Sequence, residues 1–212
     1  MLVETVQGES FAANCYIVAS ETSRRGLLID PGVQAERILE AIEILRVTPV
    51  IIVLTHAHID HCSALGTIKE KTGALFAACA TDVNQAAPAP RLIIPGLSFT
   101  PFQLPFTPDR QLNHGDTLTV DDICLTVLHT PGHSADSLCL VGHGAVFTGD
   151  TLMRGRIGAS LPGLFPGYDH RQLLESIHRI ILDLPDATIV YPGHGSATTI
   201  GKERLRVPPL PV

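Results

Sequence analysis

The stretch Thr55-His56-Ala57-His58-Ile59-Asp60-His61 places four metal-capable side chains close together, directly after the apolar run 50–54. His56 and His58 are two positions apart, so they point to the same side if the preceding strand continues through them. Asp60 and His61 follow where the chain turns from the strand toward an expected helix. One short corner can therefore offer two imidazoles to one metal ion, and a carboxylate and a third imidazole to another.

A histidine-rich tract can also be a solvated loop that binds metal only adventitiously. This tract follows a β-branched apolar run, however, and three further apolar runs lead through Gly or Pro to a potential ligand. The ligands at these corners are His133, Asp150 and His194. Glycine lets the backbone turn sharply near an ion, and proline restricts the entry to the turn. Four such corners favour a metal centre over isolated turn residues.

These motifs resemble those of the metallo-β-lactamase superfamily. Its hydrolase pattern, His-x-His-x-Asp-His followed by His, Asp and His, is matched at every ligand position. The similarity is greatest to the glyoxalase II-like branch and extends over nearly the whole chain. The segments that carry it are Asn14-Cys15-Tyr16, Asp30-Pro31-Gly32, Thr130-Pro131-Gly132-His133-Ser134, Gly149-Asp150-Thr151-Leu152 and Tyr191-Pro192-Gly193-His194-Gly195.

The resemblance implies a complete ligand set. The first metal ion is expected at His56, His58 and His133, the second at Asp60, His61 and His194, with Asp150 bridging them. The resemblance also implies the fold, an α+β four-layer αβ/βα sandwich made by a single domain over residues 1–212. Hydrophobic periodicity alone supports only a mixed α and β domain.

The clearest expected elements follow one another without a linker. They are three strands within 2–30, an amphipathic helix at 34–46, a strand at 50–54, a helix at 60–71, a strand at 74–78, strands at 117–120, 123–128, 137–141 and 145–147, a helix from the N-cap Asp169 to Leu184, and a last strand at 188–190. Asp30 could approach the metals but is interpreted as a turn residue. Cys62 directly follows a ligand and is interpreted as a small buried residue, with metal ligation as the alternative.

The chemistry that fits these ligands is hydrolysis. A dinuclear centre can lower the pKa of a bridging water toward about 7 and can polarise a carbonyl. The resemblance implies that the resulting hydroxide attacks a thioester, as in hydroxyacylglutathione hydrolases, and we assign Asp60 and Asp150 as the catalytic carboxylates. A His-rich donor set without cysteine favours two divalent ions, Zn first and Fe or Mn as alternatives. His58 favours hydrolysis over oxygen reduction, because flavodiiron members of the superfamily typically have glutamate there.

Three alternatives stay open at this point. A persulfide dioxygenase with a single iron shares the fold and motifs, and a lactone or other ester hydrolase could use the same centre. A non-catalytic metal-binding module is disfavoured, because structural zinc sites are typically closed and rich in cysteine.

The residues that contact the substrate are predicted from the loops expected to flank the metals. The candidates are Phe99, Phe102, Arg154 and Arg156. The proline-rich segment 88–108 is equally consistent with a packed surface loop, a pocket wall or a contact in a homo-oligomer. The resemblance leads us to expect a basic residue shortly after Gly158, but Ala159 follows. We therefore expect a small-molecule thioester substrate with loose selectivity for its thiol carrier.

Composition restricts the partners. With 45% hydrophobic and 17% charged residues, the 212-residue chain is typical of an ordered globular protein. A net charge of −6 and the lack of a basic cluster argue against nucleic acid. No segment has the roughly 20 apolar residues needed to cross a bilayer, and no signal peptide is recognisable, so we expect a cytoplasmic protein without a membrane partner. The five scattered cysteines argue against a disulfide framework.

Overall fold

The computed structural model describes residues 1–8, 13–80, 107–158 and 168–210. Within these ranges, one six-stranded sheet has the order β1-β2-β3-β4-β5-β6. Its strands are β1 (Leu2–Val6), β2 (Cys15–Ala19), β3 (Arg25–Ile29), β4 (Thr48–Val53), β5 (Leu75–Cys79) and β6 (Arg110–Leu112). The first three strands pair antiparallel, and β3 to β6 pair parallel. Helices α1 (Ala35–Leu45) and α3 (Leu65–Thr72) connect the parallel strands.

A second six-stranded sheet has the order β14-β13-β10-β9-β8-β7 in the described part of the chain. Its strands are β7 (Thr117–Val120), β8 (Ile123–His129), β9 (Leu138–Gly142), β10 (Ala145–Gly149), β13 (Ile189–Pro192) and β14 (Thr198–Thr199). Its pairs are antiparallel except for β10 with β13. The remaining elements are α2 (Ile59–Cys62), the hairpin of β11 (Leu152–Met153) and β12 (Arg156–Ile157), α5 (His170–Ser176), a π-helical segment (Ile177–Ile181) and α6 (Ile200–Arg204).

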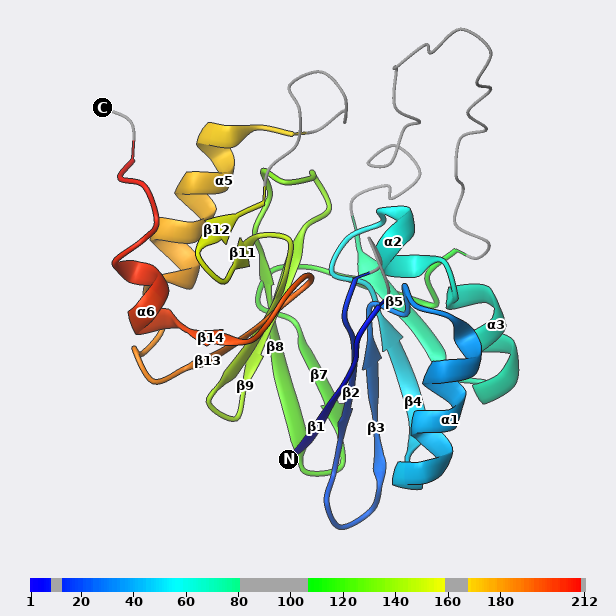
Figure 1. Cartoon of the computed structure of the whole chain (residues 1–212). Helices are drawn as coiled ribbons and strands as arrows, with labels where there is room; N and C mark the ends of the chain where they lie inside the picture. The colour runs from blue at the N-terminus through cyan, green and yellow to red at the C-terminus, as the bar shows by residue number, and fades with distance from the viewer. Residues whose placement is uncertain (9–12, 81–106, 159–167, 211–212) are drawn as a thin grey trace, which may run out of the picture.

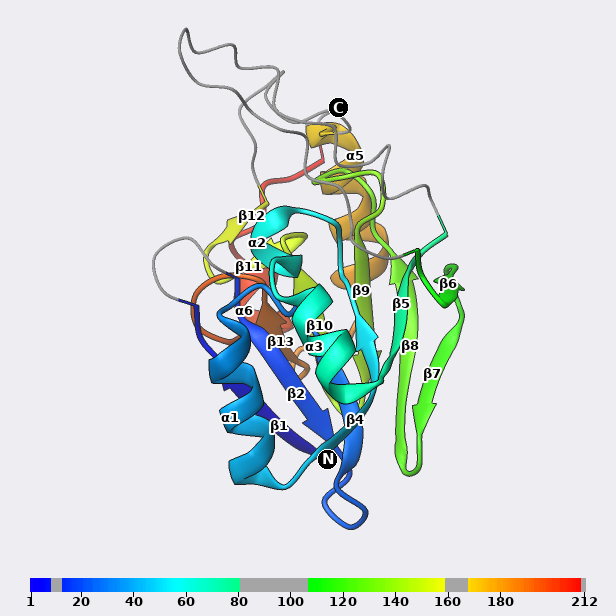
Figure 2. The same ribbon diagram turned by 90° about the vertical axis from the view of Figure 1, so that its right-hand side faces the viewer.

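The two sheets pack face to face, with helices on both outer surfaces (Figures 1 and 2). Successive side chains of β2 alternate between two cores, because neighbouring residues of a strand point to opposite faces. Tyr16 and Val18 join the core between the sheets, whereas Cys15 and Ile17 pack in the core beneath α1 and α3. A third core lies between the second sheet and α5 with its π-helical continuation. The order of layers is helix, sheet, sheet, helix, which confirms the predicted four-layer α+β sandwich.

The expected helix 60–71 is wrong in detail, because it is divided into α2 and α3. A continuous helix would bond the Ala64 N–H to the Asp60 carbonyl. Both groups bond elsewhere: the Ala64 N–H donates to Pro31 O at 2.9 Å, and Asp60 O accepts from Ala13 N–H at 3.2 Å. The contacts of the ligand corner therefore interrupt the helix.

The structure decides one point that the sequence left open and corrects one further expectation. Strand β4 ends at Val53, so the strand does not continue through His56 and His58, which lie in the loop that follows. The last predicted helix begins after the N-cap Asp169 as expected, and the Asp169 carboxylate accepts from Gln172 N–H at 2.9 Å. Its regular part is short, because it becomes π-helical from Ile177 and the helical segment ends at Ile181 instead of Leu184.

Some elements were not predicted. The sequence analysis missed β6, the β11–β12 hairpin, β14 and α6, all of which are short. The segment 88–108 with Phe99 and Phe102 lies almost entirely outside the described residues, so its predicted roles stay predictions. None of the described helices is long and apolar enough to span a membrane.

Candidate metal centre

The structure brings all seven predicted ligands together in loops that follow the ends of strands. His56 and His58 lie after β4, and Asp60 and His61 lie in α2 directly behind them. The loops after β8, β10 and β13 contribute the other three ligands, which are His133, Asp150 and His194. Contributions from both sheets thus meet at one edge of the sandwich, beside α2 in Figure 1.

Three imidazoles converge in the first group. His58 Nδ1 lies 3.0 Å from His56 Nε2 and 3.1 Å from His133 Nε2. The three rings have centroid separations of 4.5 and 4.8 Å and are steeply inclined to one another. Nitrogen atoms that face one point from three directions are the arrangement expected of ligands to a single ion.

The second group combines a carboxylate with two imidazoles. Asp60 Oδ2 lies 3.1 Å from His194 Nε2 and 3.7 Å from His61 Nε2. The ligand atoms of this group all lie within 4.8 Å of one another, as do those of the first group. His58 and Asp60 are near neighbours in sequence, so one turn of the chain supplies both groups.

Asp150 lies between the two groups. Its Oδ2 atom is 3.7 Å from His133 Nε2 in the first group and 3.6 Å from His194 Nε2 in the second. Its Oδ1 atom is 3.6 Å from His61 Nε2. Asp150 is therefore placed where a single carboxylate can contact ions in both groups.

The donor atoms fit a metal centre. His61 Nε2 and Asp150 Oδ1 are buried, and neither has a hydrogen-bond partner among the described residues. Buried polar atoms are almost always bonded, so such a pair needs a partner of another kind. A cation between them satisfies both, and a set of imidazole and carboxylate donors suits Zn, Fe or Mn. The cluster can thus bind metal, whereas the identity and number of ions stay predictions.

Asp30 does more than form the turn that the sequence predicted. Its backbone does adopt the left-handed conformation of a turn, with φ of 54°. Its buried carboxylate also accepts from Thr55 N–H and Thr55 O–H, each at 2.7 Å, and lies 2.9 Å from His61 Nδ1. Asp30 thereby orients a ligand ring from behind, as outer partners of metal-binding histidines usually do. The sequence did mark this position: like the predicted ligands, Asp30 is a metal-capable residue at the end of an apolar run, next to Pro31 and Gly32.

Asn14 and Tyr16 hold the loop that carries His194, a role that sequence reasoning missed. The Asn14 amide donates to Pro192 O at 3.0 Å and to Gly195 O at 2.9 Å, and Tyr16 O–H donates to Pro192 O at 2.6 Å. Asn14 is in the segment that carried the family resemblance, but nothing in the sequence connects it with a loop so far along the chain.

Two glycines allow the loops to approach Asp150. A Cβ atom on Gly193 would lie 2.4 Å from Asp150 Oδ1 and 2.6 Å from a ring carbon of His61. A Cβ on Gly158 would lie 1.8 Å from the Asp150 carbonyl and 3.0 Å from His133 Nδ1. A side chain at either position would therefore displace the ligands.

Burial and neighbouring charges set the protonation of the ligands. Burial lowers the pKa of His58 and of His133 to about 4 and holds the pKa of His56 well below its ordinary value. These imidazoles are neutral near pH 7, as metal binding requires. Burial also opposes a charge on His61, but the carboxylates of Asp30 and Asp150 outweigh it and raise the pKa of His61.

The same balance favours ionised carboxylates. Burial works against the charge of Asp150, but its contact with His61 and the neighbouring imidazoles hold its pKa below the ordinary range. The pKa of Asp60 is also lowered, because the contact with His194 outweighs partial burial. The centre thus combines three neutral imidazoles, those of the first group, with negative carboxylates.

The structure places Cys62, Arg154 and Arg156 outside the ligand cluster. Cys62 is buried and its thiol donates to His58 O at 3.1 Å, in agreement with the interpretation as a packing residue. Arg154 and Arg156 are exposed in the β11–β12 hairpin. Arg156 lines a cavity of about 140 Å³ shared with Glu203 and the segment that follows α6. A substrate role for either arginine stays a prediction.

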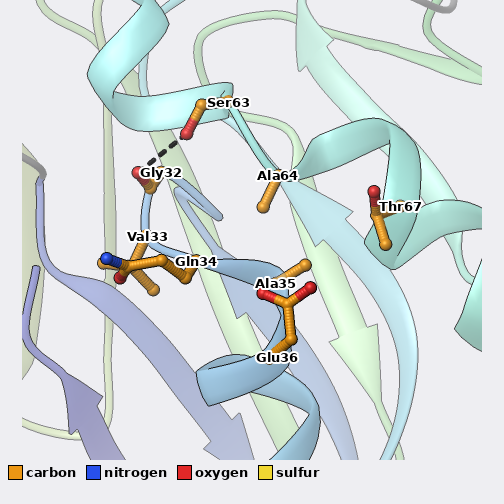
Figure 3. A pocket seen from close by; sticks show the side chains of 8 residues that line it. All are labelled: Gly32, Val33, Gln34, Ala35, Glu36, Ser63, Ala64 and Thr67. Atoms are coloured by element: carbon orange, nitrogen blue, oxygen red, sulfur yellow. Dashed lines mark hydrogen bonds between the residues drawn. The ribbon is translucent and has the colours of Figure 1, made fainter.

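A larger hollow of about 410 Å³ lies behind the ligand corner, between the starts of α1 and α3 (Figure 3). Ser63 lines it and donates to Gly32 O at 2.8 Å. Its lining contains none of the seven ligands, which separates this hollow from the metal centre.

Comparison with known proteins agrees with this geometry. The family model of the metallo-beta-lactamase superfamily matches residues 9–194. The hydroxyacylglutathione hydrolase GloC of Haemophilus influenzae is 33% identical, over 98% of this chain and 97% of that protein.

Solved structures give the same result. The B3 metallo-beta-lactamase BLEG-1 superposes with a TM-score of 0.85 at 30% identity and 98% coverage of both chains. TTHA1623, solved in a di-iron-bound form, has a TM-score of 0.76 at 32% identity, over 98% of this chain and 99% of the other. ETHE1 from Myxococcus xanthus has a TM-score of 0.79 at 27% identity, over 99% of this chain and 84% of the other.

Proposed function

The chain belongs to the metallo-β-lactamase superfamily, and from this premise we propose that it is a metal-dependent hydrolase of small thioesters that works with two metal ions. The observation that carries the proposal is the position of Asp150. Its Oδ2 atom lies at nearly equal distances from a ligand of each group, 3.7 Å from His133 and 3.6 Å from His194. A carboxylate so placed is suited to a two-ion centre and is not required by a one-ion centre.

The residues divide the work as follows. His56, His58 and His133 would hold one ion, Asp60, His61 and His194 would hold the other, and Asp150 would contact both. Ions bound in this way lower the pKa of water toward about 7 and polarise a carbonyl oxygen.

Asp60 has a second task in this proposal. Its side chain is 32% exposed, more than that of Asp150 at 13%. An ionised carboxylate at the rim can accept a proton from a water molecule that enters from solvent. Asp30 keeps the His61 ring in one orientation throughout. A thiolate leaves without a strong general acid. This fits a site in which the side chains assigned a role either bind metal or orient those that do.

Relatedness favours a thioester over other substrates. The similarity to a hydroxyacylglutathione hydrolase extends over almost the whole of both chains. Glutathione as the only carrier is not favoured, because Ala159 stands where a basic anchor is expected. We therefore propose turnover of S-lactoylglutathione and similar thioesters, with weak substrate affinity and loose selectivity for the thiol.

Hydrolysis of β-lactams is the second candidate. It is supported by the similarity to BLEG-1, a B3 metallo-beta-lactamase. The reaction uses the same chemistry, attack of water on a polarised carbonyl, so the ligand cluster does not distinguish the two substrates.

Metal analysis combined with steady-state kinetics tests these proposals. Purified protein should contain two transition-metal ions per chain and should hydrolyse S-lactoylglutathione and other acyl thioesters faster than a lactone or a β-lactam. A fully active preparation with one ion per chain would contradict the two-ion proposal. Activity on lactones or β-lactams alone would exclude the thioester assignment, and exclusive, tight use of the glutathione thioester would contradict loose selectivity. Oxygen consumption with a persulfide substrate would identify a dioxygenase instead.

A further inference from the structure

Asp136 is a buried acidic residue that belongs to neither ligand group. It lies in the turn between β8 and β9, three residues after the ligand His133, and is only 2% exposed. Its Oδ2 atom accepts from Ala57 N–H at 2.9 Å. Ala57 is the residue between His56 and His58, so Asp136 connects the loops that carry the three ligands of the first group.

The surrounding turn holds Asp136 firmly in this position. The side-chain oxygens of Ser134 and Ser137 are 2.7 Å apart, and Ser137 O accepts from Thr130 N–H at 2.9 Å. Leu138 N–H donates to Thr55 O at 2.7 Å. Two hydrogen bonds therefore join the two loops. One is the backbone bond from Leu138 N–H to Thr55 O, and the other is the bond from Ala57 N–H to the Asp136 carboxylate.

The second carboxylate oxygen of Asp136 is unusual. Oδ1 is buried and accepts no hydrogen bond from any residue that the structure describes. The ion pairs found in that part of the chain do not include Asp136 either. A buried charge without an opposite charge nearby is unfavourable, because burial favours the protonated carboxyl group, and a positive charge nearby stabilises the ionised form. The first ligand group is the candidate place for such a charge, because Asp136 bonds the backbone between His56 and His58.

We propose that Asp136 is a positioning residue for the metal centre, which aligns the His56–His58 loop with the His133 loop and whose negative charge is balanced by the ion bound there. This inference rests on the proposed metal function. It assigns two separable properties to one side chain. The hydrogen bond to Ala57 orients the loops, and the charge strengthens binding of a cation.

Two substitutions separate these properties. Asp136→Asn keeps an oxygen that can accept from Ala57 N–H but removes the charge, whereas Asp136→Ala removes both. Outer partners of metal ligands typically change metal affinity by about 10- to 100-fold. Zn²⁺ titration against a competing chelator should show about tenfold weaker binding for Asp136→Asn and about a hundredfold for Asp136→Ala. The thermal midpoint of metal-free Asp136→Asn should equal or exceed that of the wild type, because an uncompensated buried charge is gone.

Asp116 provides the matched control. Its Oδ2 atom also accepts a backbone hydrogen bond, from Asn113 N–H at 2.8 Å, but in a turn before β7. Asp116→Asn and Asp116→Ala should leave Zn²⁺ affinity unchanged.

The outcomes are distinguishable. If metal-free Asp136→Asn melts earlier than the wild type and its Zn²⁺ affinity is unchanged, Asp136 is only structural and the inference is overturned. An equal loss of affinity in the Asp116 variants overturns it as well. A wild-type protein that binds no Zn²⁺, Fe or Mn overturns the proposed metal function together with this inference. The Asn variant keeps the test decisive even if Asp136→Ala does not fold.

Discussion

Replacing Asp30 by asparagine should weaken metal binding while the protein stays folded. The substitution is nearly isosteric, and asparagine tolerates the left-handed backbone found at this position, where φ is 54°. Asparagine can still accept from Thr55 N–H, which lies 2.7 Å from Asp30 Oδ1. Its amide NH₂ group would then face His61 Nδ1, which now lies 2.9 Å from Asp30 Oδ2.

The consequence for His61 follows from the donors and acceptors. A carboxylate can only accept, so it holds the imidazole with the proton on Nδ1 and leaves Nε2 free for a metal ion. An amide NH₂ donates, which favours the tautomer with the proton on Nε2, the atom that faces Asp60 and Asp150. Loss of one charge-assisted hydrogen bond costs about 1.5–3 kcal/mol, less than the roughly 5–15 kcal/mol by which a domain is stable. We expect an affinity loss of about 10- to 100-fold, which corresponds to about 1.4–2.8 kcal/mol.

Chelator competition with Zn²⁺ measures this loss, and urea denaturation reports whether the variant is folded. Nitrogen-15 NMR of the imidazoles in the metal-free proteins reports which ring nitrogen of His61 carries a proton. Asp116→Asn again serves as the control for removing a carboxylate elsewhere. A folded Asp30→Asn protein with Zn²⁺ affinity within about twofold of the wild type would refute the argument that Asp30 controls the ligand tautomer.

Three further predictions follow from the structure. Asp150→Ala should reduce kcat/KM for thioesters by a factor of about 100 or more with little change in the thermal midpoint, and near-normal hydrolysis would remove Asp150 from the reaction. Glu203→Ala should lower the free energy of unfolding by about 2–4 kcal/mol in urea denaturation. The reason is that this buried carboxylate accepts from Gly155 N–H at 2.8 Å and Thr198 O–H at 2.6 Å. Glu175→Ala is the control: it removes a partly exposed carboxylate on α5 that pairs with Arg171, and it should change the free energy of unfolding little. The metal-free protein should lose stability as the pH falls from 6.5 toward about 4, because the unfolded chain then protonates His58 and His133 while the folded protein does not. Urea denaturation at several pH values checks this sign, and constant or rising stability over that range would contradict it.

Each candidate ligand is marked locally in the sequence, and the family resemblance implied how the candidates divide between two metal ions. Apolar runs that end in glycine or proline before His or Asp indicate strand ends, and strand ends of this kind meet at one edge of a sheet. This pattern made His133 and His194 candidates for a centre with His56 although they are far apart in the chain, and the resemblance implied which ion each would bind. Alternating and continuous apolar runs similarly identified most strands, because the residues on a buried strand face are apolar.

The sequence did not determine the backbone conformation of the segments between strands. Whether β4 continues to His56, and whether one helix covers 60–71, depended on partners for single backbone groups, such as Pro31 O for Ala64 N–H. A local pattern cannot contain that information, because those partners come from other parts of the chain.

The supports of the metal centre were decided by the tertiary structure alone. Asp30 meets His61 across 31 positions, Asp136 meets Ala57 across 79, and Asn14 meets Pro192 across 178. An acidic or amide side chain near a turn has the same appearance in a sequence whether it caps that turn or crosses the molecule to hold a ligand. Hydrogen bonds are short and directional, so only the packing of the two sheets determines which of these groups come within reach of the site.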